Sequence, residues 1–176
     1  HTSHPLNETC PAWSPDGSRL YWLSSVDAEG TGDIHSRSLR ESGSEEATYR
    51  SKDIVWPLDV SPDGQALLIG RRSTDRRGNL DVLQLSLADG KVTPVLDSEH
   101  AEAAARWSRD GRWLVYASDE SGQNEIYVRR NPDSGEKWRV SARGGGSPVW
   151  RGDGREIFYA GQGGQILGVS FRAGPT

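Results

Sequence analysis

Short apolar runs recur along the chain at nearly equal spacing, separated by polar loops. Four of these runs are almost continuously apolar, a pattern typical of strands that are covered on both faces. Each is followed by a polar loop and a third strand, and in the first three repeats a further turn leads to a short outer strand. The expected strands are 20–23, 34–39 and 47–49; then 67–69, 80–85 and 92–95; then 113–116, 125–128 and 138–140; and finally 157–159 and 165–169.

One five-residue element precedes each of the four apolar runs. Its glycines, at positions 17, 64, 111 and 154, are 47, 47 and 43 residues apart. This period fits the roughly 40 to 50 residues of a four-stranded propeller blade and excludes solenoid repeats of roughly 20 to 35 residues. Proline presets the second turn position and glycine supplies a positive φ, so the element predicts a tight hairpin turn. The copies are Trp13-Ser14-Pro15-Asp16-Gly17, Val60-Ser61-Pro62-Asp63-Gly64, Trp107-Ser108-Arg109-Asp110-Gly111 and Trp150-Arg151-Gly152-Asp153-Gly154.

The repeat predicts an all-β fold, a β-propeller of about four four-stranded antiparallel blades. The fourth repeat ends near Phe171 without an evident outer strand. Either residues 1–10 are a latch strand that closes the ring, or they are a tail and the chain is a partial propeller. A third alternative is half of a ring that a second chain completes. The expected blades are approximately 11–57, 58–104, 105–147 and 148–176.

Composition narrows the classes of partner. The chain has 21 Lys+Arg against 25 Asp+Glu, a formal net charge of −4, so no general field attracts a phosphate backbone and nucleic acid is not an expected partner. No apolar run approaches the roughly 20 residues of a membrane span, so no membrane insertion of this segment is expected. A single cysteine, Cys10, allows no internal disulfide. Residues 1–8 lack the features of a signal peptide, so composition alone does not indicate the compartment.

With the repeat laid out, the chain resembles the bacterial WD40-like propeller family typified by the periplasmic protein TolB, whose blades carry a Trp-Ser-Pro-Asp-Gly hairpin. The resemblance covers about residues 11–171 and is most specific at 105–128. Residues 137–159 are similar to the C-terminal propellers of bacterial serine/threonine protein kinases. The resemblance implies an extracytoplasmic sensor or interaction domain, periplasmic or at the cell surface. The chain contains none of the kinase motifs, and it shows four copies where six to eight blades are common in the family.

Motifs for catalysis and cofactors are absent from the sequence: there is no Gly-x-Ser-x-Gly elbow, His-Glu-x-x-His, phosphate loop or paired cysteines. We therefore expect no cofactor and no catalytic residue. His1 and His4 could chelate a metal weakly, but a terminal tail is the preferred interpretation, and no metal site is predicted. His35 and His100 lack a partner at ligand spacing and are expected on the surface. The repeated aspartates are expected to hold turns. Trp13, Trp107 and Trp150 share a repeat position and are expected to pack in the core between blades.

The leading hypothesis is a non-catalytic module that binds a protein, a peptide or a small cell-envelope ligand. Trp56 lies outside the repeat's tryptophan position and is a candidate anchor for a binding partner. The alternative is that its ring packs in the core. Arg71 and Arg72 begin a basic stretch, 71–77, expected in a loop where an anionic partner could dock. A rival hypothesis is a propeller-type lyase or hydrolase with Arg106, Asp119 and Glu120 at the channel mouth. A third is a structural half-propeller that self-associates through its end blades. The candidate binding residues are thus Trp56, Arg71, Arg72, Arg106, Asp119 and Glu120.

Overall fold

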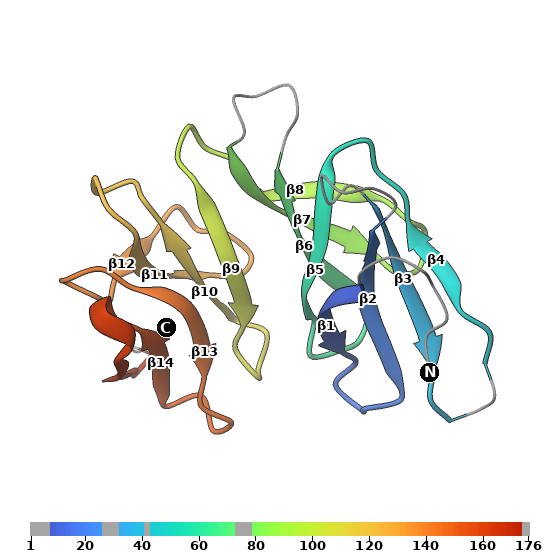
Figure 1. The fold of residues 1–176 in the computed structure, drawn as a ribbon. Helices are drawn as coiled ribbons and strands as arrows, with labels where there is room; N and C mark the ends of the chain where they lie inside the picture. Colours follow the sequence, from blue (N-terminus) through green and yellow to red (C-terminus); the bar gives the residue numbers. More distant parts are fainter. Residues whose placement is uncertain (1–7, 26–31, 41–42, 73–78, 174–176) are drawn as a thin grey trace. The chain divides into compact units, whose positions relative to one another are not determined.

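The computed structural model describes residues 8–25, 32–40, 43–72 and 79–173. These residues form four antiparallel sheets and one short 3-10 turn, η1 (Gln162–Gly164), so the prediction of an all-β chain is confirmed (Figure 1). Successive strands pair with one another in every sheet, as in a blade that is built from consecutive hairpins. Blade 1 is β1 (Glu8–Trp13), β2 (Arg19–Ser25), β3 (Gly32–Ser38) and β4 (Glu46–Tyr49); blade 2 is β5 (Ile54–Val60), β6 (Ala66–Arg72), β7 (Leu80–Ser86) and β8 (Val92–Leu96); blade 3 is β9 (Glu102–Trp107), β10 (Trp113–Ser118), β11 (Glu125–Arg130) and β12 (Lys137–Arg139); blade 4 is β13 (Gly146–Trp150), β14 (Glu156–Ala160) and β15 (Ile166–Ser170).

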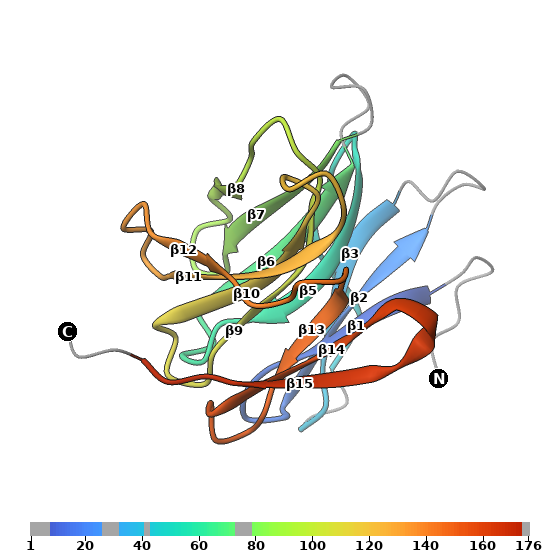
Figure 2. The ribbon, with the colours of Figure 1, turned by 90° about the vertical axis from the view of Figure 1, so that its left-hand side faces the viewer.

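Blades 1 and 2 belong to one compact unit, His1–Glu99, and blades 3 and 4 to a second, His100–Thr176. Blade 4 has three strands among the described residues, in agreement with the missing outer strand of the fourth repeat. In Figure 2, β15 is its outer strand. The first strand, β1, pairs with β2 of blade 1 and includes Glu8–Cys10, which the sequence assigned to the tail or latch.

The four repeated elements form the predicted hairpin turns. In each turn the glycine has a φ between 67° and 72°, and its amide donates to the carbonyl oxygen three residues earlier at 2.8–2.9 Å. The aspartate accepts a hydrogen bond from the amide two residues further on at 3.0–3.1 Å. Hydrogen bonds from the neighbouring serine hydroxyls lower the pKa of Asp16 and Asp63 below the ordinary value. The aspartates therefore hold the turns as hydrogen-bond acceptors, and their role in the turns is as the sequence predicts.

The inner strands depart from a regular period at equivalent positions. Each has an irregular register near its middle or start, and Cys10, Ala104 and Ser147 adopt positive φ values of 55°, 53° and 50° there. A bulge inserts an extra residue and reverses the alternation of side chains, so these strands carry no clear two-residue pattern. The approximate boundaries expected at 57/58, 104/105 and 147/148 lie within β5, β9 and β13.

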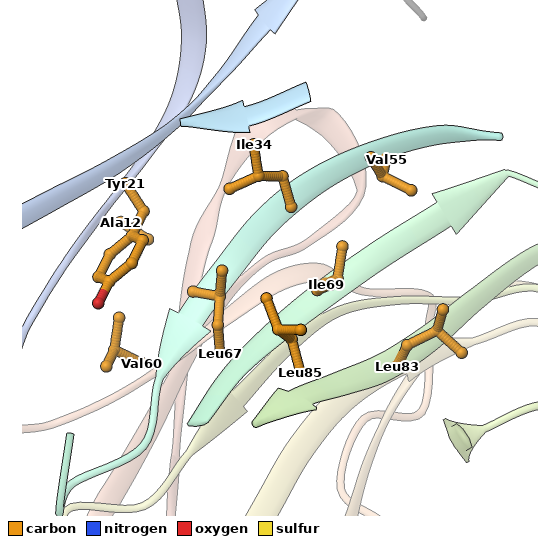
Figure 3. Packing of buried hydrophobic residues seen from close by; sticks show 9 residues of the cluster. All are labelled: Ala12, Tyr21, Ile34, Val55, Val60, Leu67, Ile69, Leu83 and Leu85. Carbon is orange, nitrogen blue, oxygen red and sulfur yellow. The ribbon is translucent and has the colours of Figure 1, made fainter. Parts of the chain in front are cut away.

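The core of the first unit lies between blades 1 and 2. Ile34 of β3 and Leu67 of β6, both fully buried, come from facing sheets (Figure 3). Burial on both faces explains why the central strands β2 and β6 are almost continuously apolar. The whole cluster is Ala12, Tyr21, Ile34, Val55, Val60, Leu67, Ile69, Leu83 and Leu85.

Blades 3 and 4 share a second core, in which Trp113 and Trp150 both pack around Phe171. The ring centroids of Trp113 and Phe171 are 5.1 Å apart, and those of Trp150 and Phe171 are 5.0 Å apart, both edge to face. The indole nitrogen of Trp150 donates to the carbonyl oxygen of Arg106 at 3.2 Å, which joins the inner strands of the two blades. Trp150 therefore packs between blades 3 and 4, as expected from its repeat position.

Trp13 does not follow this rule, because its side chain is 56% exposed. It occupies the repeat position in blade 1, but so large an exposed fraction does not fit a core residue. The expectation that Trp13 is a core residue is wrong for this reason.

Candidate functional site

Three of the predicted binding residues lie at one end of blade 2. Trp56 on β5 pairs with Gly70 on β6, and a methyl group added to Gly70 would lie 2.3 Å from the Trp56 ring. The indole therefore lies against the backbone of its own blade and is half-buried. Arg71 and Arg72 are the last residues of β6, so the prediction that places them in a loop is wrong. Residues 73–77 of that basic stretch lie outside the described residues.

Arg71 is already engaged by a buried carboxylate. Its Nε and Nη2 atoms donate to Oδ2 of Asp81 at 3.1 Å and 2.6 Å, and Asp81 is 1% exposed. Burial lowers the pKa of Arg71, but the bond to Asp81 and nearby carboxylates outweigh burial and raise it. Arg71 therefore stabilises a buried ion pair, and of these two arginines only Arg72 is exposed.

Acidic residues occupy equivalent positions at the start of the third strand in the first three blades. Asp33 pairs with Arg50 at 3.4 Å, Asp81 with Arg71, and Glu125 accepts hydrogen bonds from its neighbours. Each carboxylate lies opposite the residue seven positions after the turn glycine. The repeated placement indicates a structural function in each blade.

Glu125 is fully buried and has three donors. Its carboxylate accepts from Ser141 Oγ, from the Gly144 amide at 3.1 Å and from Gln123 Nε2 at 2.7 Å. Burial raises the pKa of Glu125, but these hydrogen bonds outweigh it and leave the pKa below its ordinary value. Since Ser141 and Gly144 belong to the connection between β12 and β13, the carboxylate fastens that connection to blade 3.

The residues suspected of lyase or hydrolase chemistry do not form an acid–base pair. Asp119 accepts from the Ala101 amide at 2.9 Å, and Glu120 pairs with Lys137. Arg106 lies on β9, half-buried, and not in the turn that holds Asp119 and Glu120. Asp119 and Glu120 are thus occupied by contacts that hold the β10–β11 turn. His35 differs from expectation too: its side chain is 19% exposed, and its Nδ1 lies 2.6 Å from Glu45.

The second unit contains a groove of about 980 Å³ that the sequence did not predict. It is lined by the repeat turns of blades 3 and 4 and by the chain after β15, with Trp113 and Phe171 contributing apolar surface. Five arginines and three carboxylates line it, so the lining has a formal net charge of +2 although the chain as a whole has −4. These charged residues are Arg109, Arg112, Arg151, Arg155 and Arg172, with Asp110, Asp153 and Glu156.

The carboxylates of the groove neutralise only some of its arginines. Arg112 Nε donates to Asp110 at 2.7 Å, and Arg151 Nη1 donates to Glu156 at 2.7 Å. Within the described part of the chain, the side chains of Arg155 and Arg172 have no ion pair or hydrogen bond. Their guanidinium groups are available to an anionic ligand.

A comparison of the repeat copies could have indicated this groove. Where the first two turns have Pro15 and Pro62, the third has Arg109. After the glycine the third and fourth turns have Arg112 and Arg155, where the first two have a serine and a glutamine. The turn is formed in all four copies, so folding does not require these arginines.

No family model matches the sequence. Among solved structures, TolB from Acinetobacter baumannii is similar with a TM-score of 0.75 and 22% identity, over 95% of this chain and 41% of TolB. A nidogen/laminin complex has a TM-score of 0.68 at 10% identity, over 93% of this chain and 60% of that chain. The S511A mutant of puromycin hydrolase, complexed with PGG, has a TM-score of 0.71 at 16% identity, over 93% of this chain and 27% of that one.

The chain has the β-propeller fold. At these identities the similarity concerns the fold, and TolB-type propellers and peptidase-associated propellers both share it. The chain spans less than half of the TolB chain that it matches. No helix in the described residues is long and apolar enough to cross a membrane. The described residues also include no group of three His, Cys, Asp or Glu side chains suited to a metal ion.

Proposed function

We propose that this propeller is a non-catalytic binding module, and that the arginine-lined groove of blades 3 and 4 contacts its protein or peptide partner. The observation that carries the proposal is a groove of about 980 Å³ with two arginines that the described residues leave unpaired. Rigid blades that present variable turns are a common way to build a binding surface. The similar nidogen structure was solved as a complex with laminin, which supports a protein partner.

The electrostatics of the described carboxylates support binding rather than acid–base catalysis. Those whose pKa is displaced, namely Asp16, Asp63, Asp89, Asp110 and Glu125, are all displaced downward. A general acid at neutral pH needs a carboxyl pKa that is raised toward 7. These groups are therefore ionised hydrogen-bond acceptors. We also propose that the module lies outside the cytoplasm. The resemblance of residues 137–159 to kinase-associated propellers supports the further proposal that it is the sensor domain of a receptor kinase.

Site-specific photo-crosslinking tests the proposal. A benzophenone amino acid replaces Arg109, which is exposed and lines the groove, in the full chain in cells of the source organism. The matched control replaces Lys91, which is exposed in the β7–β8 turn of the other unit. We expect a discrete crosslinked partner from position 109 and none from position 91. Crosslinking at neither position, or equally at both, would refute the groove as the binding surface.

A second candidate function is self-association through blade 4. The outward face of this three-stranded sheet exposes Val149 at 46% and Ile166 at 82%, and its outer strand β15 has no described neighbour on one side. Apolar faces and unpaired strand edges favour association with another sheet. A second copy of this chain is the occupant we test.

Light scattering on a sizing column gives the native mass. A dimer of about twice 19.3 kDa that dissociates on Ile166→Lys would support self-association through this face. A monomer at high micromolar concentration would refute it.

A further inference from the structure

We propose that the groove recognises an acidic peptide segment, whose carboxylates pair with Arg155 and Arg172. This inference rests on the proposed function, because it names the chemistry of the partner that the groove binds. Four observations carry it. Arg155 and Arg172 have no partner among the described residues, and an equivalent turn folds without an arginine at the position of Arg155. Trp113 and Phe171 give the groove an apolar surface, and the chain as a whole has a negative net charge.

The carboxylates of the groove are engaged by groups other than the guanidinium groups of Arg155 and Arg172. Asp110 and Asp153 accept the amides of Arg112 and Arg155 at 3.1 Å and 3.0 Å, so these carboxylates are committed to the backbone. Asp110 also forms an ion pair with the Arg112 guanidinium, and Arg151 forms ion pairs with both Asp153, at 3.5 Å, and Glu156. Nothing among the described groove residues neutralises Arg155 or Arg172. An anionic ligand would complete the pairing.

The repeat turn does not require an arginine at the position of Arg155. Gln65 stands in blade 2 where Arg155 stands in blade 4, and the Gln65 amide makes the same hydrogen bond to its aspartate at 3.0 Å. Arg172 follows β15 and is exposed. The Arg155 side chain can therefore serve a ligand without a loss of turn stability, and the exposed Arg172 lines the same groove.

Peptide carboxylates fit the groove better than a nucleic acid backbone. The guanidinium fork matches the planar carboxylate with two parallel hydrogen bonds. Trp113 and Phe171 add an apolar surface for a side chain of the same peptide, and the volume suits a ligand of several residues. The chain's formal net charge of −4 provides no extended positive field for a phosphate polymer.

The test uses fluorescence anisotropy with the full chain. The probe is a short fluorescein-labelled peptide rich in Asp and Glu with one central Phe, and its counterpart has Asn and Gln in place of the acids. The protein variants are Arg155→Gln, which introduces the residue that blade 2 has at the equivalent position, Arg172→Gln and the double variant. The control is Arg143→Gln, which removes an exposed arginine of the same unit outside the groove.

We expect saturable binding of the acidic peptide that weakens roughly tenfold in the double variant and roughly tenfold for the amide peptide. Arg143→Gln leaves the affinity unchanged, and added salt weakens binding. Equal binding of both peptides, no effect of the double variant, or no saturation below about 1 mM would overturn the proposal. Displacement of the probe by micromolar inorganic phosphate would reassign the groove to phosphate esters.

The photo-crosslinking experiment distinguishes a wrong ligand class from a wrong surface. If a partner crosslinks at position 109 but the acidic peptide fails to bind, the ligand class is wrong and the binding groove stands. If neither occurs, the groove is not a binding surface.

Discussion

The buried carboxylate of Glu125 gives the most direct test of how blade 3 is joined to the connection that leads into blade 4. We consider Glu125→Gln, which preserves shape but removes the charge. The two oxygens of Glu125 accept from Ser141 Oγ, the Gly144 amide and Gln123 Nε2, while Ser141 Oγ itself accepts from the Ile126 amide at 2.7 Å. A glutamine amide keeps one oxygen acceptor and turns an NH₂ donor toward the Ser141 hydroxyl.

The expected cost follows from these contacts. Hydrogen bonds to a charged group contribute about 1.5–3 kcal/mol and neutral ones about 0.5–1.5 kcal/mol, so the two bonds to the remaining oxygen lose about 1 kcal/mol each. The serine bond reverses, with the glutamine NH₂ donating to Ser141 Oγ, and loses about the same amount. The charge also no longer needs to be buried, which offsets part of the loss. We expect the free energy of unfolding to fall by about 2 kcal/mol at pH 7.

The sign of the pH dependence is fixed by the lowered pKa of Glu125, whose ordinary value is 4.5. A carboxyl group with a lower pKa in the folded state stabilises the protein above the unfolded value, and this stabilisation is lost as the pH falls through the folded value. The difference between the parent chain and Glu125→Gln is therefore complete at pH 7 and shrinks below pH 4.5.

Urea unfolding at pH 7 and about pH 3, followed by tryptophan fluorescence, measures this difference. Hydrogen exchange at the Gly144 amide reports the local effect, because this amide donates a hydrogen bond to Glu125. The control is Glu136→Gln, whose exposed side chain lies 3.7 Å from Arg130 and should change stability by less than about 0.5 kcal/mol. A gap that persists at about pH 3, or a Glu125→Gln variant as stable as the control, would refute the reasoning.

Three further predictions concern the blade framework. Gly70→Ala should destabilise by about 1–3 kcal/mol in urea unfolding and change the Trp56 emission, because the new methyl group would lie 2.3 Å from the ring; Gly146→Ala, with no atom within 4 Å, is the control. Arg71→Met should cost about 3–5 kcal/mol of thermal stability by leaving buried Asp81 without its cation, and Asp81→Leu in the same chain should restore most of it; no recovery would contradict the ion-pair argument. Ala104→Gly should raise the melting temperature, since φ is 53° there and glycine removes about 1 kcal/mol of strain; an unchanged or lower value would contradict that view.

The blades could be predicted because their determinants are local. An Asp-Gly turn followed by an apolar strand is visible in one stretch of chain, and its recurrence gives the period. The inner strands were harder to recognise, because the irregular register near Ala104 and Ser147 interrupts their side-chain alternation. The error for Trp13 arose because a shared repeat position does not ensure the same burial in every copy.

The binding residues were harder to predict because they depend on distant pairings. Arg71 and Arg72 look like part of a basic loop, but the partner that buries the first, Asp81, is ten residues away on the next strand. From the sequence, Asp119 could be a catalytic acid. The structure shows instead that it accepts a hydrogen bond from the Ala101 amide, eighteen residues away. The groove combines turns of two repeats, so neither turn alone reveals it.

Differences between the copies locate the groove more directly than the shared features do. The common Asp-Gly pair is explained fully by the turn, since its carboxylate and glycine φ are the same in every blade. What the turn does not explain is why Arg112 and Arg155 both follow that pair in the two blades that enclose the groove, whereas Ser18 and Gln65 follow it elsewhere. A repeat chain thus supplies its own internal controls: a residue absent from equivalent, correctly folded copies is not needed for folding. Arg155 meets that criterion and is unpaired among the described residues, and this is why its guanidinium group is the first to test with an anionic ligand.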